Sequence, residues 1–243
     1  MGEISKKGIR KDNIVILLTG TVDPGHMVMT ARNNPEVRKD DYERSIRKWA
    51  GTGYKLIFCE NSNYDIRSIR NIKSRNTFEI LQYEGLDYDK KLGKGYGEQL
   101  ILKHVFRESN LIHNDSIIVK VAGRYFVRNI DAILHAVDDP TKVYVNLYRD
   151  LKNCDSRLFI AGRQFIEEYF FPVSPEINDS VDTSFEHILT KAVLTYLADG
   201  GGWSLLPKYP RFEGISGTTN EKITTWLYLK SMIRHIIKQK IQY

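Results

Sequence analysis

Continuous apolar runs alternate, along the first half of the chain, with segments whose apolar residues recur at helical spacing. The runs predict strands over 13–19, 54–59, 77–83 and 116–121, and the helical patterns cover 40–50, 66–72, 98–108 and 129–137. Unbroken apolar runs are typical of strands buried on both faces, and strands that alternate with helices favour a parallel sheet. The pattern therefore predicts an α/β fold, with a mostly parallel sheet flanked by helices.

The second half of the chain adds two strand-like stretches and two helical patterns. The strand-like stretches cover 142–149 and 157–161, and a long helix is predicted over 183–197, before three consecutive glycines. A basic amphipathic pattern runs from 221 to 243. Because no internal repeat or Ser/Gly linker interrupts the pattern, we predict one domain over 1–220 with a C-terminal amphipathic helix over 221–243.

The charge balance narrows the class of partner. The sequence has 36 Lys and Arg residues against 30 Asp and Glu residues, a net charge of +6. This excess suggests an anionic partner, and phosphates, nucleic acids and membrane surfaces all qualify. Cys59 and Cys154 make neither a disulfide framework nor a zinc cluster, and no apolar run is long enough for a membrane helix. We therefore expect a cytoplasmic protein.

Polar clusters stand at the carboxyl ends of three predicted strands. They are Thr19-Gly20-Thr21 after the first strand, Glu60-Asn61-Ser62 with Asp65 after the second, and Lys120 with Arg124 at the fourth. Ligands of open α/β sheets bind beyond the carboxyl ends of the strands. A single cluster of this kind is also typical of an ordinary polar loop, but three at one rim favour a small-molecule crevice.

Three basic residues suit a ligand that carries phosphate. Lys94 belongs to a glycine-rich turn, Gly93 to Gly97, which opens a helix but lacks the spacing of a P-loop. Lys120 ends an apolar strand and Arg124 offers a fork that matches a diphosphate, so this pair would neutralise a leaving nucleotide diphosphate in place of a divalent metal. The alternative for Lys120 is a salt bridge to a carboxylate.

The candidate acid/base residues lie at the start of the long helix in the second half. Among Asp179, Asp182, Glu186 and His187, either Asp182 or Glu186 would act as general base toward an acceptor hydroxyl. The alternative is structural, because the Thr-x-x-Glu spacing of residues 183–186 is that of a capping box. A metal site built from Asp179, Asp182 and His187 is a further alternative, although the spacing of these residues matches no recognised motif.

A later loop carries side chains that can bond sugar hydroxyls. These are Arg211, Glu213 and Ser216 around Gly214, with Trp203, Tyr209 and Phe212 nearby as stacking faces for sugar rings. The alternative is a structural turn flanked by core aromatic residues.

These motifs resemble those of bacterial polysaccharide glycosyltransferases of the GT-A type, from capsule and lipopolysaccharide O-antigen clusters. The motifs are Thr19-Gly20-Thr21, Glu60-Asn61-Ser62 with Asp65, Gly93-Lys-Gly-Tyr-Gly-Glu98, Lys120-Val-Ala-Gly-Arg-Tyr125 and Gly214-Ile-Ser-Gly-Thr218. The resemblance covers residues 13–220. It implies a GT-A fold, transfer of a sugar from a nucleotide-sugar, most often a UDP-sugar, and a saccharide acceptor that is lipid-linked.

The resemblance also implies roles for individual residues. The donor half, about 13–140, would hold the nucleotide, and the acceptor half, about 141–220, the saccharide. By this resemblance the nucleoside is surrounded by Thr19, Gly20, Thr21, Glu60, Asn61, Ser62 and Asp65, and the diphosphate lies near Lys94, Lys120 and Arg124. The base is Asp182 or Glu186. The acceptor is contacted by Arg211, Glu213, Gly214 and Ser216.

One motif of that family departs from its pattern. GT-A enzymes usually carry an Asp-x-Asp metal motif after the fourth strand, where this chain has Lys120-Val-Ala-Gly-Arg124. We therefore expect that no metal cofactor is required, with the basic pair in its place; Mn²⁺ or Mg²⁺ held elsewhere stays the alternative.

Other classes of protein stay open at this point. A sugar nucleotidyltransferase would share the sheet, but residues 20–25 lack the repeated glycines that this class needs after the first strand. A basic nucleic-acid-binding protein would gather its charge in a stripe, whereas Lys and Arg are scattered here apart from the termini. The polar rim argues against an inert interaction module. The 221–243 pattern suits peripheral contact with the anionic inner face of a membrane, or a helix packed on the domain.

Overall fold

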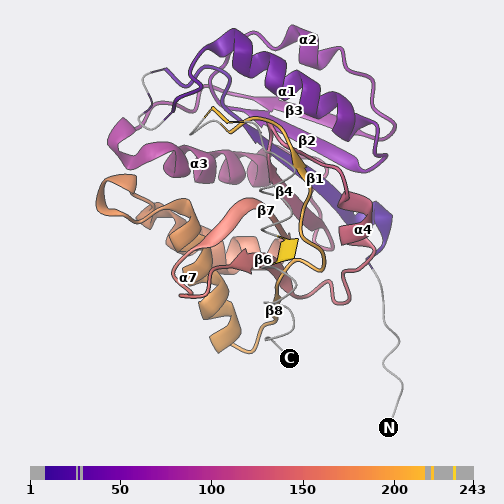
Figure 1. Cartoon of the computed structure of the whole chain (residues 1–243), viewed down its shortest axis with the longest axis vertical. Coiled ribbons are helices and arrows are strands. Elements are labelled where there is room, and N and C mark those ends of the chain that lie inside the picture. Colours follow the sequence, from indigo (N-terminus) through magenta and orange to yellow (C-terminus); the bar gives the residue numbers. More distant parts are fainter. Residues whose placement is uncertain (1–8, 26, 28–29, 217–219, 222–231, 234–243) are drawn as a thin grey trace.

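A seven-stranded sheet forms the centre of the computed structural model, which describes residues 9–25, 27, 30–216, 220–221 and 232–233 (Figure 1). In spatial order its strands are β3 (Phe78–Gln82), β2 (Lys55–Glu60), β1 (Ile14–Gly20), β4 (Ile117–Ala122), β7 (Cys154–Gly162), β6 (Val143–Leu147) and β8 (Trp203–Ser204). Only β7 runs antiparallel to its neighbours in this sheet. The predicted α/β fold with a mostly parallel sheet is confirmed.

Helices cover both faces of the sheet (Figure 1). One face packs against α1 (Pro35–Ala50), α2 (Arg67–Arg70) and α4 (Ile130–Leu134), and the other against α3 (Gly93–Glu108) and α7 (Phe185–Ala198). All seven residues of β1 are buried between these layers, as its continuous apolar run predicts.

Short elements connect the layers. They are the 3₁₀ turns η1 (Lys11–Asn13), η2 (Lys90–Leu92), η4 (Ser174–Glu176) and η5 (Asp179–Val181), the π-helical η3 (Ile166–Phe170) between α5 (Arg163–Phe165) and α6 (Phe171–Val173), and the strand pair β5 (Phe126–Val127) and β9 (Phe212–Glu213). The β5–β9 pair joins the segment after β4 to the loop that begins near residue 211.

Several predicted boundaries are wrong, and local capping explains why. Helix α1 begins at Pro35 rather than at residue 40, because the Asn34 side chain accepts a hydrogen bond from the N–H of Val37 and proline suits the first helical position. The predicted Thr183 capping box is also wrong by one residue. Ser184 caps α7 by accepting from the N–H of His187.

The glycine-rich segment is the first turn of α3 and not a turn that precedes the helix. Gly93 has φ +83°, and a side chain there would collide with the carboxylate of Asp179, since a Cβ would lie 1.9 Å from Oδ2. The helix itself therefore begins against η5, which brings the segment before α7 to the same end of the sheet.

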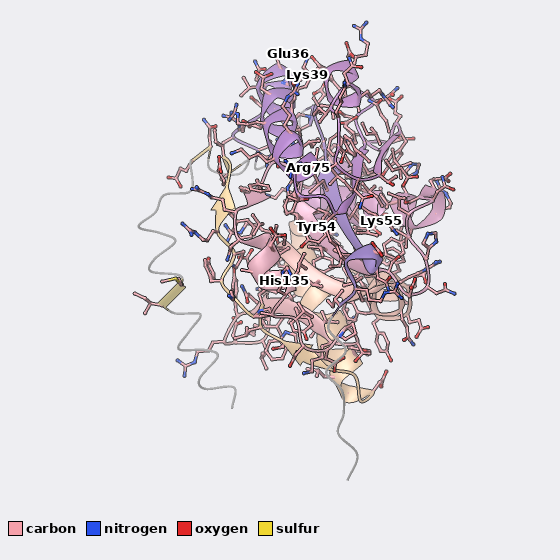
Figure 2. All side chains as sticks on the ribbon, turned by 90° about the vertical axis from the view of Figure 1, so that its right-hand side faces the viewer. Glu36, Lys39, Tyr54, Lys55, Arg75 and His135 are labelled. Carbon is pink, nitrogen blue, oxygen red and sulfur yellow. The ribbon has the colours of Figure 1, made fainter. Side chains whose placement is uncertain are left out.

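The opposite end of the sheet, where the strands begin, faces the viewer in Figure 2. Tyr54, Lys55 and Arg75 stand there at or just before the starts of β2 and β3. Within the described residues, no helix is both long and apolar enough to cross a membrane. The predicted helix over 221–243 lies outside the described residues, apart from Glu221, Met232 and Ile233.

Candidate functional site

A pocket of about 790 Å³ opens at the carboxyl ends of β1 and β4. From β1 the chain passes to β2 and β3 on one side, whereas β4 joins β1 on the other, so these two strands form the switch point of the sheet. Ligands of open α/β sheets bind outside such a point. The pocket is lined by Thr19, Gly20 and Thr21 at the end of β1 and by Lys120 and Arg124 at the end of β4.

A chain of buried polar contacts crosses the floor of this pocket. The Thr19 hydroxyl donates to Oε1 of Glu98 at 2.8 Å, and the Lys120 ammonium lies 2.6 Å from the same oxygen. Lys120 is fully buried and also donates to the carbonyl of Ser156 at 3.0 Å. The Ser156 hydroxyl in turn donates to Oε1 of Glu186 at 2.7 Å. Residues from β1, α3, β4, β7 and α7 are thereby joined.

Lys120 forms a salt bridge with Glu98, which was the alternative to a role in binding a diphosphate. A buried ammonium needs an opposite charge, and Glu98 from α3 provides it. Lys120 still lines the pocket, so its role toward a diphosphate stays a prediction.

The predicted nucleoside residues divide into two groups. Thr19, Gly20 and Thr21 line the pocket, whereas Glu60, Asn61, Ser62 and Asp65 do not. The reason is visible for Glu60, which has no exposed surface. Its Oε1 accepts from the N–H groups of Val22 and Ser62, both at 2.9 Å, and from the Ser62 hydroxyl. This carboxylate fixes the loop after β1.

The other members of that cluster face the protein or the solvent. Asn61 accepts from the Thr21 hydroxyl at 2.7 Å, and its Nδ2 is buried without a described partner. Asp65 pairs with Arg67 in an exposed contact, and the hydrogen bonds from Arg67 lower the pKa of its carboxyl to about 2. Neither residue lines the pocket.

A carboxylate occupies the N-terminus of α3. Asp179 accepts backbone hydrogen bonds from Lys94 and Gly95, at the place where the sequence predicts a phosphate. Burial raises the pKa of Asp179, and the nearby Glu186 carboxylate raises it further, while Lys94 and the two N–H groups oppose the shift. Lys94 lines the pocket beside this contact.

The two candidate bases differ in their surroundings. Asp182 is exposed, lines the pocket, and has φ +57°, a left-handed conformation uncommon outside glycine. Glu186 is half-buried on the first turn of α7 and anchored by Ser156. The structure therefore brings both carboxylates to the pocket, but among the described residues a hydrogen-bond donor holds the carboxylate of Glu186 alone.

A second, smaller pocket adjoins the first. Its volume is about 370 Å³, and it lies between the β6–β7 turn and the start of α7. Asn153, Ser156, Arg157, Ser184 and Glu186 line both pockets, so the two are contiguous at these side chains. The smaller pocket is also lined by Tyr148, a half-exposed residue.

Of the predicted acceptor residues, Ser216 alone lines the larger pocket. Glu213 pairs instead with Lys48 of α1, and the N–H of Arg211 donates to the Asn129 side chain at 2.8 Å. Gly214 approaches the carbonyl of Arg124 so closely that a Cβ would lie 2.6 Å from it. The β5–β9 pairing holds this loop beside the pocket and turns most of these side chains away.

Glu98, Ser156 and Arg157 are among the lining residues to which the sequence analysis gave no individual role. Glu98 stands one turn before the buried apolar residues of α3, and a carboxylate so close to an apolar helix face was a usable signal. Ser156 was missed because β7 begins at Cys154, three residues before the predicted strand, and Arg157 was read only as the first residue of that strand. Burial raises the pKa of both cysteine thiols, so neither is suited to nucleophilic chemistry.

The residues at the β4 end do not fit a divalent cation. Within the described part of the chain, no three His, Cys, Asp or Glu side chains gather in a way that would hold a metal. Where a carboxylate motif would stand, the pocket presents Lys120 and Arg124. Cationic side chains at this position repel a metal ion.

Comparisons with known proteins show resemblance in fold at low identity. No family model matches the sequence, and no curated protein sequence matches it significantly. Similar solved structures include the inositol-1-phosphate CTP transferase from T. maritima, with 12% identity, a TM-score of 0.45, and coverage of 92% of this chain and 96% of that chain. A nucleotide-diphospho-sugar transferase from Desulfovibrio desulfuricans G20 is 10% identical, with a TM-score of 0.45 over 80% and 79% of the chains.

A glycosyltransferase involved in glycosylation of the major capsid of PBCV-1 is 12% identical, with a TM-score of 0.45 over 79% of this chain and 80% of that chain. These proteins differ in the reaction that their names describe. The function of this chain has to be argued from its own pocket residues.

Proposed function

We propose that the protein is a glycosyltransferase that moves a sugar from a nucleotide-sugar, specifically a UDP-sugar, to a saccharide acceptor. The observation that carries the proposal is the position of Glu186, which lines both contiguous pockets. A group-transfer enzyme with two substrates needs its general base between them, within reach of the attacking hydroxyl. Glu186 satisfies this requirement, and Ser156 holds its carboxylate in place.

In this proposal the larger pocket holds the donor. Thr19, Gly20 and Thr21 contact the nucleoside, and Lys94 and Arg124 lie near the diphosphate. Their positive charge, with that of Lys120 below, favours the negative charge that develops on the leaving diphosphate. These proposed donor contacts all lie within the half of the chain that spans about 13–140.

The smaller pocket holds the acceptor. It is lined entirely by residues of the 141–220 half, and the half-exposed Tyr148 among them is an aromatic residue of the kind that stacks on sugar rings. Assignment of the acceptor to surface polysaccharide assembly, as a lipid-linked capsule or O-antigen saccharide, rests on the sequence resemblance alone.

The reaction follows from these positions. Glu186 takes the proton of the acceptor hydroxyl as its oxygen attacks the anomeric carbon, and the bond between that carbon and the diphosphate oxygen breaks. The electron pair leaves with the nucleoside diphosphate, which the basic residues stabilise. Attack from the side opposite the leaving group inverts the anomeric configuration. Asp182, on the same pocket wall, is the second candidate for the base.

A first assay needs no known acceptor, because water can replace the acceptor hydroxyl. Purified protein incubated with UDP-sugars in the presence of a chelator is expected to release UDP and free sugar. Glu186→Gln should lower this rate by about 100-fold or more, since general-base catalysis contributes at least that much. Glu176→Gln, an exposed glutamate paired with Lys191, is the matched control.

The same assay tests the sugar nucleotidyltransferase alternative. Such an enzyme, given a UDP-sugar and pyrophosphate, would form UTP and a sugar 1-phosphate. Pyrophosphate-dependent UTP formation would contradict the glycosyltransferase proposal. Activity abolished by chelator and restored by Mn²⁺ or Mg²⁺ would contradict the metal-independent part alone.

A further inference from the structure

The hydroxyl of Thr19 has its proton directed into the protein. The oxygen lies 2.8 Å from Oε1 of Glu98, and an ionised carboxylate can only accept hydrogen bonds. Thr19 must therefore be the donor in this contact. A threonine hydroxyl has one proton and two lone pairs, so what remains available toward the pocket is an acceptor.

The buried ion pair beneath Thr19 fixes this polarity. The Lys120 ammonium lies 2.6 Å from the same Glu98 oxygen and is 1% exposed, so the carboxylate is paired with a full positive charge. A charged acceptor binds a hydroxyl proton more strongly than a neutral ligand atom does. The Thr19 hydroxyl therefore keeps its hydrogen bond to Glu98 when a ligand fills the pocket.

The next hydroxyl along the chain has the same polarity. The Thr21 hydroxyl, just after β1, donates to Oδ1 of Asn61 at 2.7 Å, which again leaves an acceptor oxygen. The main-chain carbonyls of Thr19 and Gly20 each accept one hydrogen bond already, from the N–H groups of Gly123 and Asn61, at 2.9 and 3.1 Å. The hydroxyl oxygens of Thr19 and Thr21 are the side-chain acceptors at this end of β1.

We propose that Thr19 is a specificity-determining residue that accepts a hydrogen bond from a hydroxyl group of the ligand, with Thr21 as a second acceptor. Glu98 and Lys120 are positioning residues that fix the acceptor role of Thr19. This inference rests on the proposed function and deepens it. The hydroxyl that donates to Thr19 is a ring hydroxyl, which belongs either to the ribose or to the transferred sugar. A ligand without that hydroxyl leaves the Thr19 lone pairs unpaired in a pocket floor where Thr19 is only 6% exposed.

The test measures binding of UDP, 2′-deoxy-UDP, 3′-deoxy-UDP and one UDP-sugar to the wild type, Thr19→Val and Thr19→Ser. Valine keeps the shape of threonine, removes both the proton and the lone pairs, and leaves the Glu98–Lys120 pair intact. The conservative serine variant should restore the selectivity. Thr195→Val is the matched control, because the Thr195 hydroxyl bonds to the Lys191 carbonyl on an exposed turn of α7. Urea unfolding of each variant checks the fold.

If Thr19 contacts the ribose, Thr19→Val weakens the binding of UDP about tenfold, the size of one hydrogen bond, and one deoxy analogue binds the wild type and Thr19→Val equally. If Thr19 contacts the transferred sugar, Thr19→Val leaves the binding of UDP unchanged and weakens the binding of the UDP-sugar about tenfold. Equal affinities of wild type and Thr19→Val for every ligand, or an equal loss for every ligand, would overturn the inference. Absence of any binding by the wild type would overturn the proposed function itself, and the inference with it.

Discussion

Glu60 illustrates a charged residue whose work is local. The sequence placed it in the nucleoside site, but its carboxylate has no exposed surface and accepts the N–H groups of Val22 and Ser62. A buried polar group aimed at main-chain donors organises the loop that contains them. Glu60 is thus one of the side chains that hold the loop after β1, together with Arg38, which donates to the carbonyls of Thr21 and Val22, and Ser62, which accepts from the N–H of Asp23.

Glu60→Gln is therefore expected to act on stability. The amide can no longer accept at both oxygens, which leaves buried donors unpaired and lowers the free energy of unfolding by about 3 kcal/mol. Asp65→Asn, at an exposed position in the same cluster, should change it by less than about 0.5 kcal/mol. Urea denaturation of both variants gives the comparison, and equal midpoints for the two would contradict this account.

The stability effect of Asp179 depends on pH. Burial and Glu186 raise its pKa in the folded protein, so its charged form is less favourable there than in the unfolded chain. The associated stability is complete below the ordinary carboxyl pKa of about 3.9 and is lost as pH rises through the raised value.

Asp179→Asn removes this charge and keeps an oxygen that can accept from the N–H groups of Lys94 and Gly95. The variant should melt at a higher temperature than the wild type at pH 7, with the difference disappearing toward pH 4. Melting curves across that range test it. A difference that is the same at pH 4 and pH 7 would show that the cause is not titration of Asp179.

At the scale of elements, the start of α7 places Glu186. Ser184 accepts from the N–H of His187 and thereby fixes the first turn of the helix, on which Glu186 lies. The cap fixes where α7 begins, and the buried side chains of Phe185, Ile188 and Leu189 fix which face of the helix packs on the sheet. Together they leave Glu186 on the side of the helix that borders both pockets.

Ser184→Ala should lower the free energy of unfolding by about 1 kcal/mol, as expected for loss of an N-cap. Thr183→Ala, which removes the cap predicted from the sequence, should cost less than half of that. Thermal or urea unfolding of the pair distinguishes the two registers. A larger loss of unfolding free energy in Thr183→Ala than in Ser184→Ala would show that Thr183 is the N-cap.

At the scale of the whole molecule, the larger pocket joins elements that are far apart in the sequence. Its walls come from β1, α3, the end of β4, the start of β7 and the start of α7. A ligand that contacts all of them stabilises the folded chain as one unit, because only the folded state binds it.

Saturating nucleotide should therefore raise the melting temperature. UDP at 100 times its dissociation constant adds about 2.7 kcal/mol, which corresponds to roughly 5–10 °C for a protein of this size. A panel of UDP, GDP, CMP and dTDP, each with chelator and with Mn²⁺, identifies the base that is preferred. We expect the shift with UDP and chelator; a shift that requires Mn²⁺ would return attention to Asp179, Asp182 and His187.

The sequence by itself determined the sheet, because buried parallel strands have to be continuous apolar runs and β1, β2 and β4 are such runs. It also determined the rim, since polar clusters that follow parallel strands meet at one edge. Asn34 followed by Pro35 was a readable helix start that the surrounding polar run concealed.

Only the tertiary structure decided which rim residues face the pocket. Glu60 and Thr21 belong to neighbouring clusters of similar polarity, yet one is turned into the protein and the other lines the cavity. The sequence pattern records polarity and spacing, whereas the direction of a side chain depends on partners such as the N–H of Val22, 38 positions away. The same holds for Lys120, whose partner Glu98 comes from another element and is found only when α3 packs on the sheet.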